Sequence, residues 1–579
     1  MKNETKQCQN CKFEFTIEPD DFSFYEKIKV PPPTFCPECR MKARYAFRSQ
    51  TSLYRRICDL CKSSIISMYA PEKPFPVYCR DCFYGDKWEA TSYEQNMDFN
   101  KPFFEQFQEL MDKTPRIALI GTNKINSDYT THCSNVKNCY LCFSIGHSED
   151  CFYLGPQCVN DKNCCSCSIT RFSEWSYMLV DCEKCYKTSF SQNSINCIES
   201  MFLYDCRNCQ NCLGCVNLRN KNYFILNKQY TKKECLIRKK ELALDTFEGF
   251  ENFKKEFEKL KEISIHKYSS MTNSKECTGD NVINSRNCKN CFVIYDSENT
   301  KYSYICNKAK ESMDVTHVYP SSEFSYYSIS PIDSNKIYFS SFVQSNSYDM
   351  WYCDNCYTSH DCFGSISIRN KSYCILNKQY TEEEYLTLKE KIIFQMSTAP
   401  YLGKNNRVYK FGDFFPFEIS PFDYNESVLQ EYFPLTKEEI LKKGYSWHDP
   451  VNKSYKISIK VGDLSLRIQE IGDDIIKETI ECEHKGNCVH NCSTAFRILP
   501  DEMQIYKILE VPIPKLCQNC RYAERISLRN PMKLWHRTCI CDKTNHNHTG
   551  KCPNEFETSY APERPEIIYC EKCYQQEVY

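Results

Sequence analysis

Residues 8–40 read CQNCKFEFTIEPDDFSFYEKIKVPPPTFCPECR. They contain two Cys-x2-Cys pairs, and residues 12–35 lie between these pairs. Two residues between cysteines let one tight turn point two thiolates at one ion. Two such turns complete the tetrahedral four-sulfur shell that Zn²⁺ prefers. The stretch therefore predicts a small module that gains much of its folding free energy from a bound metal ion.

The same spacing occurs at both ends of the 579-residue chain. Three intervals between cysteine pairs have the same length at the two ends: 12–35 matches 493–516, 40–57 matches 521–538, and 62–78 matches 553–569. The connecting residues match too, because YAPE stands at 69–72 and again at 560–563. Equal intervals with matching residues indicate an internal duplication. We expect about four Zn²⁺, with the ligands Cys8, Cys11, Cys36 and Cys39; Cys58, Cys61, Cys79 and Cys82; Cys488, Cys492, Cys517 and Cys520; Cys539, Cys552, Cys570 and Cys573.

The third set departs from the pattern, because its first pair is Cys488-x3-Cys492. Cys482 is therefore an alternative ligand to Cys488. In either case four cysteines close the coordination shell, and a closed shell indicates a structural role, since a catalytic zinc keeps an open position.

The fourth set carries an insertion. Twelve residues separate Cys539 from Cys552 where the N-terminal copy has two, so ten residues are added. The insertion is either a further metal site or a solvated loop with incidental histidines. Its candidate ligands are Cys541, His546 and His548.

A resemblance to a known family rests on these same residues. Residues 8–40 resemble a small bacterial zinc-binding domain of the treble-clef or zinc-ribbon type. The whole layout, including CPNEFETSYAPERPEIIYCEKCY at 552–574, resembles large zinc-ribbon proteins of candidate-phylum bacteria over essentially the full chain. The resemblance implies bound zinc, and it implies no activity.

Composition narrows the class of protein. The chain has 42 cysteines but 15 glycines, and its formal net charge is −1. The start, MKNETKQCQN, is polar and lacks the apolar core of a secretory signal. There is no apolar run of the ~18 residues that a membrane span needs. We therefore expect a cytoplasmic protein with no membrane partner, in which paired cysteines bind metal instead of forming disulfides.

The cysteines between 133 and 382 follow a different pattern, C-x-x-C-[FY]. The pattern starts at residues 139, 182, 288 and 353. The first two starts are 43 residues apart and the last two are 65 apart, which is close to two and three steps of about 22 residues. A longer duplication relates 217–234 to 367–384. Short alternating runs, such as YFSSFVQSNSY at 338–348, indicate strands. These features predict a parallel β-helix of about 22 residues per coil, with cysteine as a small buried side chain.

A row of metal sites is the rival interpretation of this region. Its best candidate is 206–215, where cysteine stands at every third position. In the second copy of the duplication, Cys209 and Cys215 become Ser359 and Ser365, so that copy lacks two of the four ligands.

Sequence signals also predict helices and an overall architecture. Thr-x-x-Glu capping boxes begin at 231, 381 and 436, and we expect helices over 231–263, 381–396 and 102–113. The architecture is multidomain and mainly β, with treble-clef or zinc-ribbon modules flanking a cysteine-rich, parallel β-helix-like repeat region with bracing helices. Its segments are 1–90, an N-terminal double zinc-binding module; 91–132, a helical linker; 133–265 and 266–397, two β-solenoid halves, each with a helix; 398–480, an aromatic and helical connector extended over the other domains; and 481–579, a C-terminal double zinc-binding module.

Arginine rows follow the second cysteine pair at each end. A spacing of four residues aligns the side chains on one face of a helix. Such a row, with aromatic residues nearby, can bind phosphates and stack bases. The alternative is pairing with acids such as Glu26 or Glu510, or simple solvation. The rows are Arg40, Arg44 and Arg48, and Arg521, Arg525 and Arg529.

Two hypotheses for function follow. The first is a non-enzymatic zinc-binding scaffold or nucleic-acid-binding protein, with RNA, DNA or another protein as partner. The alternative is a redox or transferase enzyme that uses an exposed cysteine of the solenoid groove, such as Cys215 or Cys362. The sequence has no GxGxxG, GxxxxGK[ST] or HExxH motif and only 11 histidines, which disfavours the enzyme.

Overall fold

The protein consists of two compact units, each built from separate stretches of the chain. Unit 1 combines Met1–Leu119 with Ser269–His448, and unit 2 combines Ile120–Tyr268 with Asp449–Tyr579. Each terminal cysteine module therefore belongs with the more distant half of the repeat region. The computed structural model describes residues 2–318, 322–326, 334–335, 337–338, 346–449, 455–464 and 467–579.

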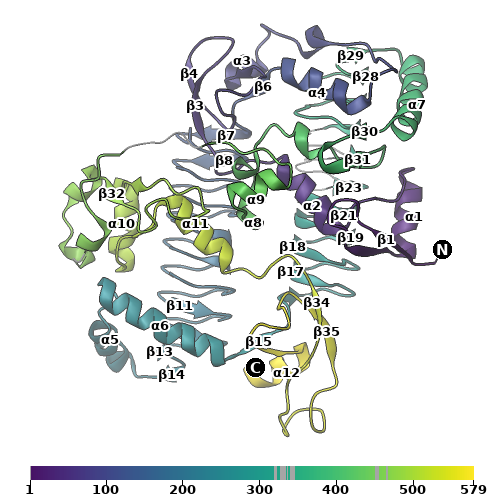
Figure 1. Cartoon of the computed structure of the whole chain (residues 1–579). Helices are drawn as coiled ribbons and strands as arrows, with labels where there is room; N and C mark the ends of the chain where they lie inside the picture. The colour runs from purple at the N-terminus through teal and green to yellow at the C-terminus, as the bar shows by residue number, and fades with distance from the viewer. Residues whose placement is uncertain are drawn as a thin grey trace. The chain divides into compact units, whose positions relative to one another are not determined.

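Each unit contains a ladder of short strands in which the chain pairs with itself in parallel (Figure 1). In unit 2, Glu174 bridges Tyr186, Tyr186 bridges Ile198, and Ile198 bridges Gln210, a register step of twelve, whereas the earlier bridges that start at 146, 149 and 152 have a step of thirteen. Parallel columns of this kind pass through residues 180, 183, 186 and 189, three residues apart. The ladder of unit 1 also has mostly this step, as between Phe292 and Tyr304, but the step is eleven from 271 to 282 and thirteen from 309 to 322.

The ladder strands of unit 2 are β7 (Gly121–Ile125), β8 (Cys133–Lys137), β9 (Ser168–Arg171), β10 (Val180–Glu183), β11 (Met201–Tyr204), β12 (Leu213–Val216) and β13 (Phe224–Ile225), and β14 (Lys228–Gln229) closes the series antiparallel to β13. Those of unit 1 are β16 (Met271–Thr272), β17 (Gly279–Ile283), β18 (Cys291–Tyr295), β19 (Glu298–Lys301), β20 (Tyr304–Asn307), β21 (Ala309–Met313), β22 (Thr316–Val318), β23 (Ser322–Glu323), β24 (Ser334–Asn335), β25 (Ile337–Tyr338), β26 (Tyr348–Trp351), β27 (His360–Phe363) and β28 (Cys374–Ile375), with β29 (Lys378–Gln379) antiparallel to β28.

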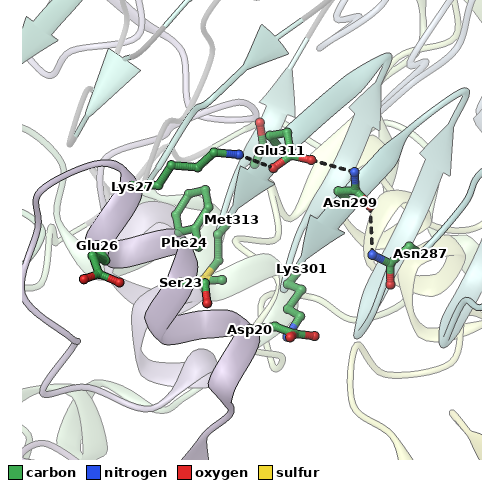
Figure 2. Close-up of a pocket in the computed structure, with 11 residues that line it drawn as sticks. Asp20, Ser23, Phe24, Glu26, Lys27, Asn287, Asn299, Lys301, Glu311 and Met313 are labelled. Atoms are coloured by element: carbon green, nitrogen blue, oxygen red, sulfur yellow. Dashed lines mark hydrogen bonds and ion pairs between the residues drawn. The ribbon is translucent and has the colours of Figure 1, made fainter. Parts of the chain in front are cut away.

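Left-handed residues turn the chain between neighbouring columns. Every third residue from Asp181 to Tyr223 has a positive φ. Asparagine, common at these positions, tolerates this conformation better than most non-glycine residues. Its side chain also bonds to the residue one register step away. Asn287 Nδ2 donates to Asn299 Oδ1 at 2.8 Å, and Asn299 Nδ2 donates to Glu311 Oε1 at 2.6 Å (Figure 2).

Most cysteines of the ladders are buried and donate hydrogen bonds to backbone carbonyls. Cys206 Sγ lies 3.6 Å from the oxygen of Tyr204 and 3.4 Å from that of Cys215. Inward serines behave alike, since the Ser191 hydroxyl donates to the carbonyl two residues back at 2.8 Å. Burial raises the pKa of Cys133 to about 12, which keeps that thiol neutral and able to donate. The same two contacts recur at Cys139, Cys142, Cys158, Cys182, Cys185, Cys288 and Cys353.

The predicted repeat length is wrong, because the register of both ladders advances in steps of eleven to thirteen residues, mostly twelve, which is about half the expected coil. The sequence held a signal for the shorter step. Cys185, Cys197 and Cys209 follow one another at this interval. Asn196 and Asn208, both left-handed, immediately precede two of these inward cysteines. The C-x-x-C spacing is thus the step between neighbouring columns. The alternating run at 338–348 lies largely outside the described residues.

Replacing a ladder cysteine by serine should be mild. In Cys139→Ser, the hydroxyl can donate to the carbonyls of Lys137 and Ser148 that the thiol now contacts. We expect the free energy of unfolding to fall by about 1–2 kcal/mol, as for the loss of a small buried apolar group. Urea denaturation measures this, and native mass spectrometry should find the metal content unchanged. Release of a metal ion would contradict the packing role.

Every four-cysteine region joins a two-stranded antiparallel hairpin to a helix. The helix has a cysteine as its N-cap in each case: Cys36, Cys79, Cys517 or Cys570. The elements are β1 (Glu4–Gln7), β2 (Glu14–Ile17) and α2 (Pro37–Ala46); β3 (Tyr54–Ile57), β4 (Ser64–Ser67) and α3 (Arg80–Tyr84); β32 (Ile480–Glu481), β33 (Ala495–Phe496) and α11 (Gln518–Ser527); β34 (Trp535–Thr538), β35 (Glu555–Thr558) and α12 (Glu571–Val578).

The predicted helices are confirmed with one change. The structure has α4 (Phe103–Lys113) and α7 (Glu382–Thr398), but residues 231–263 form two helices, α5 (Lys232–Glu241) and α6 (Phe247–Ile263). The break lies where Ala243 is left-handed, three residues before the new N-cap. All three predicted capping boxes form. Among the described residues, no helix combines the length and apolar character that crossing a bilayer requires.

Helices pack on the two ladders at equivalent glycines of the longer duplication. Gly214 and Gly364 both have φ near +62°. A Cβ on Gly214 would lie 2.7 Å from Phe253 of α6, and one on Gly364 would lie 2.8 Å from Phe103 of α4. Both the backbone conformation and the close approach of a phenylalanine ring therefore favour glycine here.

The aromatic segment after α7 packs within unit 1 instead of forming a loose linker. The Phe415 ring lies 5.2 Å from that of Phe47 and 5.1 Å from that of Phe107. Phe422 stacks on Tyr69 at 5.2 Å. Short helices α8 (Val428–Tyr432) and α9 (Lys437–Lys442) follow.

Candidate metal centres

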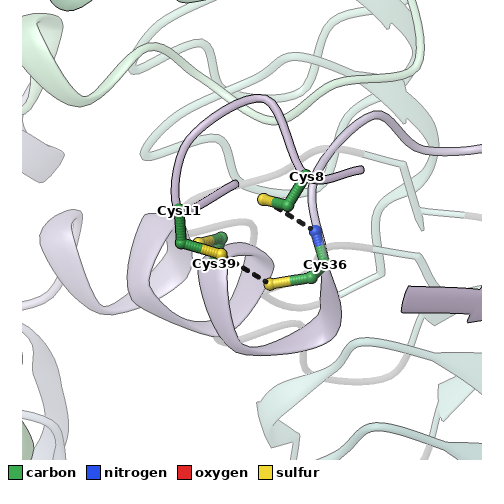
Figure 3. Close-up of side chains that lie close together, drawn as sticks. All are labelled: Cys8, Cys11, Cys36 and Cys39. Carbon is green, nitrogen blue, oxygen red and sulfur yellow. Dashed lines mark hydrogen bonds between the residues drawn. The ribbon is translucent and has the colours of Figure 1, made fainter. Parts of the chain in front are cut away.

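The first centre brings together Cys8, Cys11, Cys36 and Cys39 (Figure 3). The turn between β1 and β2 supplies the first two, and the N-terminus of α2 supplies the other two. Cys11 Sγ lies 3.6 Å from Cys36 Sγ, and the amide of Cys36 donates to Cys8 Sγ at 3.3 Å. Backbone N–H groups at a helix start stabilise thiolate charge, so the local fold favours the ligand form of these side chains.

The amide-to-sulfur bond recurs in all four centres, always from the N-cap cysteine to the first cysteine of the group. It measures 3.3 Å in the first three centres and 3.2 Å in the fourth. The centres are therefore copies of one local structure. The other groups are Cys58, Cys61, Cys79 and Cys82; Cys482, Cys492, Cys517 and Cys520; and Cys539, Cys552, Cys570 and Cys573.

The sulfur spacings fit a tetrahedral metal ion. A Zn–S bond of about 2.3 Å requires tetrahedral edges of about 3.8 Å. The Sγ atoms of Cys61 and Cys79 are 3.9 Å apart, as are those of Cys552 and Cys570, and all ligand atoms of a group lie within 4.8 Å of one another. These spacings are far above the ~2.05 Å of a disulfide. The groups are compatible with structural zinc sites.

The thiol pKa values shift in opposite directions within these groups, since those of Cys36 and Cys82 are raised while those of Cys8 and Cys61 are lowered. Hydrogen bonds from Cys36 and Cys39 lower the pKa of the Cys8 thiol far below its ordinary value. The hydroxyl and amide of Ser63 lower the pKa of Cys61 to about 6. A thiolate at neutral pH is the form that binds metal.

The third centre corrects one predicted ligand. Cys482, not Cys488, completes the group with Cys492, Cys517 and Cys520. Cys482 Sγ accepts a hydrogen bond from the backbone amide of the N-cap Cys517, as Cys8 Sγ does from that of Cys36 in the first centre. The spacing misled because the turn between β32 and β33 is longer than its N-terminal counterpart, and it places a second cysteine near the expected position.

The insertion in the fourth centre is folded against the centre's helix. Cys541 Sγ lies 3.1 Å from His546 Nδ1, and both side chains are buried. His546 Nε2 lies 2.9 Å from Glu577 Oε1 of α12. His548 Nδ1 lies 2.8 Å from the carbonyl of Gly550. Two of the three predicted ligands are thus in contact, while His548 does not bond to them among the described contacts.

The arginine row of the first module is buried within unit 1, which contradicts its prediction as a nucleic-acid surface. Arg40 Nε lies 2.7 Å from Asp314 Oδ2, and Arg44 Nη1 lies 3.1 Å from Asp314 Oδ1. All three arginines of the row, Arg40, Arg44 and Arg48, have side chains that are at most 2% exposed, and Asp314 is 0% exposed. Guanidinium groups so buried cannot reach a phosphate. They attach α2 to the ladder at the residue after β21.

The row of the second module is likewise directed into unit 2. Arg521 Nη1 lies 3.2 Å from Glu502 Oε1, and Arg525 is 1% exposed. Arg529 Nε lies 3.2 Å from Asp181 Oδ2 in the ladder. Pairing with acids was the alternative interpretation, and the structure supports it with different acids from those suggested by the sequence. These arginines therefore attach α11 to its own ladder.

The cysteines suggested for an enzyme are inaccessible. Cys215 and Cys362 are both 0% exposed, so neither is the exposed nucleophile that the hypothesis needs. Cys215 Sγ donates to the carbonyls of Leu213 and Phe224 at 3.3 and 3.6 Å. Burial raises the pKa of the Cys362 thiol, which opposes formation of a reactive thiolate.

A cavity of about 600 Å³ lies in unit 1 beside α1 (Pro19–Lys27) (Figure 2). Both of its lysines are paired, with Lys27 Nζ 3.1 Å from Glu311 Oε2 and Lys301 Nζ 2.7 Å from Oδ1 of the adjoining Asp21. The described residues that line it include no cysteine or histidine. The cavity therefore offers no nucleophile of the predicted kind.

No protein-family model matches the sequence, and no curated protein does either.

Proposed function

We propose that this protein is a non-enzymatic, zinc-dependent scaffold in which each terminal metal module clamps a repeat ladder. The arginine pairs carry the proposal. The helix that supplies two cysteine ligands also supplies Arg40 and Arg44, which bind the buried Asp314 of the ladder. In unit 2, α11 bonds to its ladder through Arg521, which donates to the Ser166 hydroxyl, and Arg525, which donates to the Ser168 hydroxyl, each at 3.2 Å. Metal binding then fixes the helix, and the helix fixes the ladder.

The metal modules belong, in this proposal, to the treble-clef type, and the chain to the bacterial zinc-ribbon proteins that its sequence resembles. A hairpin turn and a helix N-terminus, each giving two cysteines, support this assignment. Zinc is favoured because it prefers a closed tetrahedral shell of thiolates. Many reduced thiols fit a reducing compartment, and we propose the cytoplasm.

The ladders are, we propose, parallel β-helices in which each coil spans one register step, mostly of twelve residues. The nearly constant offset, the four columns within 180–225 and the left-handed residue at every third position support this. Inward cysteine, serine and threonine then satisfy backbone carbonyls inside the coil.

The partner of such a scaffold is, we propose, another protein. The arginine rows that favoured RNA or DNA are engaged inside the units. Repeat ladders generally offer long surfaces for other macromolecules. Full-length protein purified at low salt should carry no defined nucleic acid, and sequencing of one specific RNA or DNA from it would favour the nucleic-acid alternative.

Metal removal tests the structural role. We expect purified, reduced protein to hold one Zn²⁺ in each of the four tetrads. A strong chelator should unfold the terminal modules, because a structural zinc site contributes roughly 10–16 kcal/mol of binding free energy to folding. Hydrogen exchange should then rise across residues 4–90 and 480–579. Modules that stay protected after complete metal loss would contradict the proposal.

A further inference from the structure

We propose that the third centre is dinuclear: a second metal ion is bound by His484, Cys488, His490 and Cys520, and Cys520 bridges it to the ion of the neighbouring tetrad. One ligand atom from each of these four residues lies within 4.8 Å of the others. Two thiolates and two imidazoles form a donor set that suits tetrahedral Zn²⁺.

The sulfur geometry places Cys520 in two tetrahedra. Its Sγ lies 3.9 Å from Cys482 Sγ and 3.8 Å from Cys488 Sγ. Both distances match the edge of about 3.8 Å that a tetrahedral Zn–S shell requires. Cys482 already completes the four-thiolate group, so Cys488 is not needed there. Its position beside Cys520 is explained by a second ion.

The two histidines supply the independent observation. The Nδ1 atoms of His484 and His490 are buried, and neither has a hydrogen-bond partner in the described part of the chain. Their ring centroids are 5.9 Å apart. A buried polar atom without a partner is costly, and metal coordination would satisfy both nitrogens.

The loop holds these residues in place without the metal. The amide of Asn487 donates to the carbonyl of His484 at 2.7 Å, which turns the chain back toward the tetrad. Asn519 Nδ2 of α11 donates to the carbonyl of Asn491 at 2.7 Å and fixes the far end of the loop. The donor set is thus held at both ends beside the helix that carries Cys520.

Charge also favours a second ion. A zinc ion with four thiolates is a negative centre, and thiolates at this depth are only partly solvated. The second ion brings two positive charges but only one additional thiolate, since Cys520 is shared and the imidazoles are neutral. The combined centre is therefore less negative than the tetrad alone.

Native mass spectrometry of the full-length, zinc-loaded protein tests this proposal. We expect one Zn²⁺ more than the number of four-cysteine tetrads. His490→Ala and Cys488→Ser should each lose that single ion and keep the others. His490→Cys should retain it, because a thiolate replaces the imidazole. His536→Ala, which changes an exposed histidine paired with Glu557 at 2.9 Å, is the matched control and should lose none.

The outcomes separate this proposal from the scaffold proposal. Wild-type protein with only one ion per tetrad at excess zinc would overturn the dinuclear centre and leave the structural tetrads intact. Unchanged metal content in both His490→Ala and Cys488→Ser would also overturn it. Empty tetrads in a folded, reduced protein would overturn both. If the variants fail to fold, the wild-type count decides together with that of Cys541→Ser, which must keep the additional ion because Cys541 lies in the fourth centre beside His546.

Discussion

Cys36→Ser should release the metal of the first centre and unfold the N-terminal module. Cys36 is both a ligand and the N-cap of α2, and its amide also bonds to Cys8 Sγ. Three thiolates leave an open, weakened site, and a structural zinc contributes free energy comparable to the whole stability of a domain, roughly 5–15 kcal/mol. Native mass spectrometry should show one ion fewer, and hydrogen exchange should rise over residues 4–47.

The ladder variant Cys139→Ser serves as the matched control for Cys36→Ser, since both exchange one buried sulfur for oxygen. Their difference in stability isolates the contribution of the metal. Retention of every ion by Cys36→Ser, with a stable module, would show that the tetrad is not a metal centre.

Asp314→Asn should destabilise unit 1 by about 3–5 kcal/mol, the usual effect of removing one partner from a buried ion pair. Asp314 is 0% exposed and is shared by Arg40 and Arg44. An amide of the same size removes the negative charge that both buried guanidinium groups contact. Urea denaturation, monitored in parallel with metal content, should show the loss of stability.

Glu38→Gln is the control for Asp314→Asn. Glu38 pairs with Lys42 on the same helix, α2, and is largely exposed. Exposed pairs contribute less than about 1 kcal/mol, so this variant should behave like the wild type. Equal effects of the two substitutions would mean that the Asp314 pair does not hold α2 to the ladder.

The terminal centres could be predicted largely from the sequence, because cysteine spacing controls local geometry. Two intervening residues are enough to aim two thiolates at one point, whatever surrounds the turn. The capping boxes at Thr231, Thr381 and Thr436 formed for the same reason, since their bonds join residues three apart. In the long turn before Cys492 the first two cysteines are not two residues apart, so the spacing did not identify the ligand. There Cys488 was wrong for the tetrad, and the alternative, Cys482, is the cysteine that completes it.

Local sequence was enough to predict that the two thiols of each terminal C-x-x-C turn lie close together, and where the capped helices start, because both depend on neighbours within a few residues. The register of the ladders and the role of the arginines emerged only from the packing of distant segments. A spacing of four put Arg40 and Arg44 on one helix face, but it could not say whether that face met solvent or Asp314, which lies 270 residues further along the chain from Arg44. Pairing across such separations depends on how whole elements pack, and no local pattern records it.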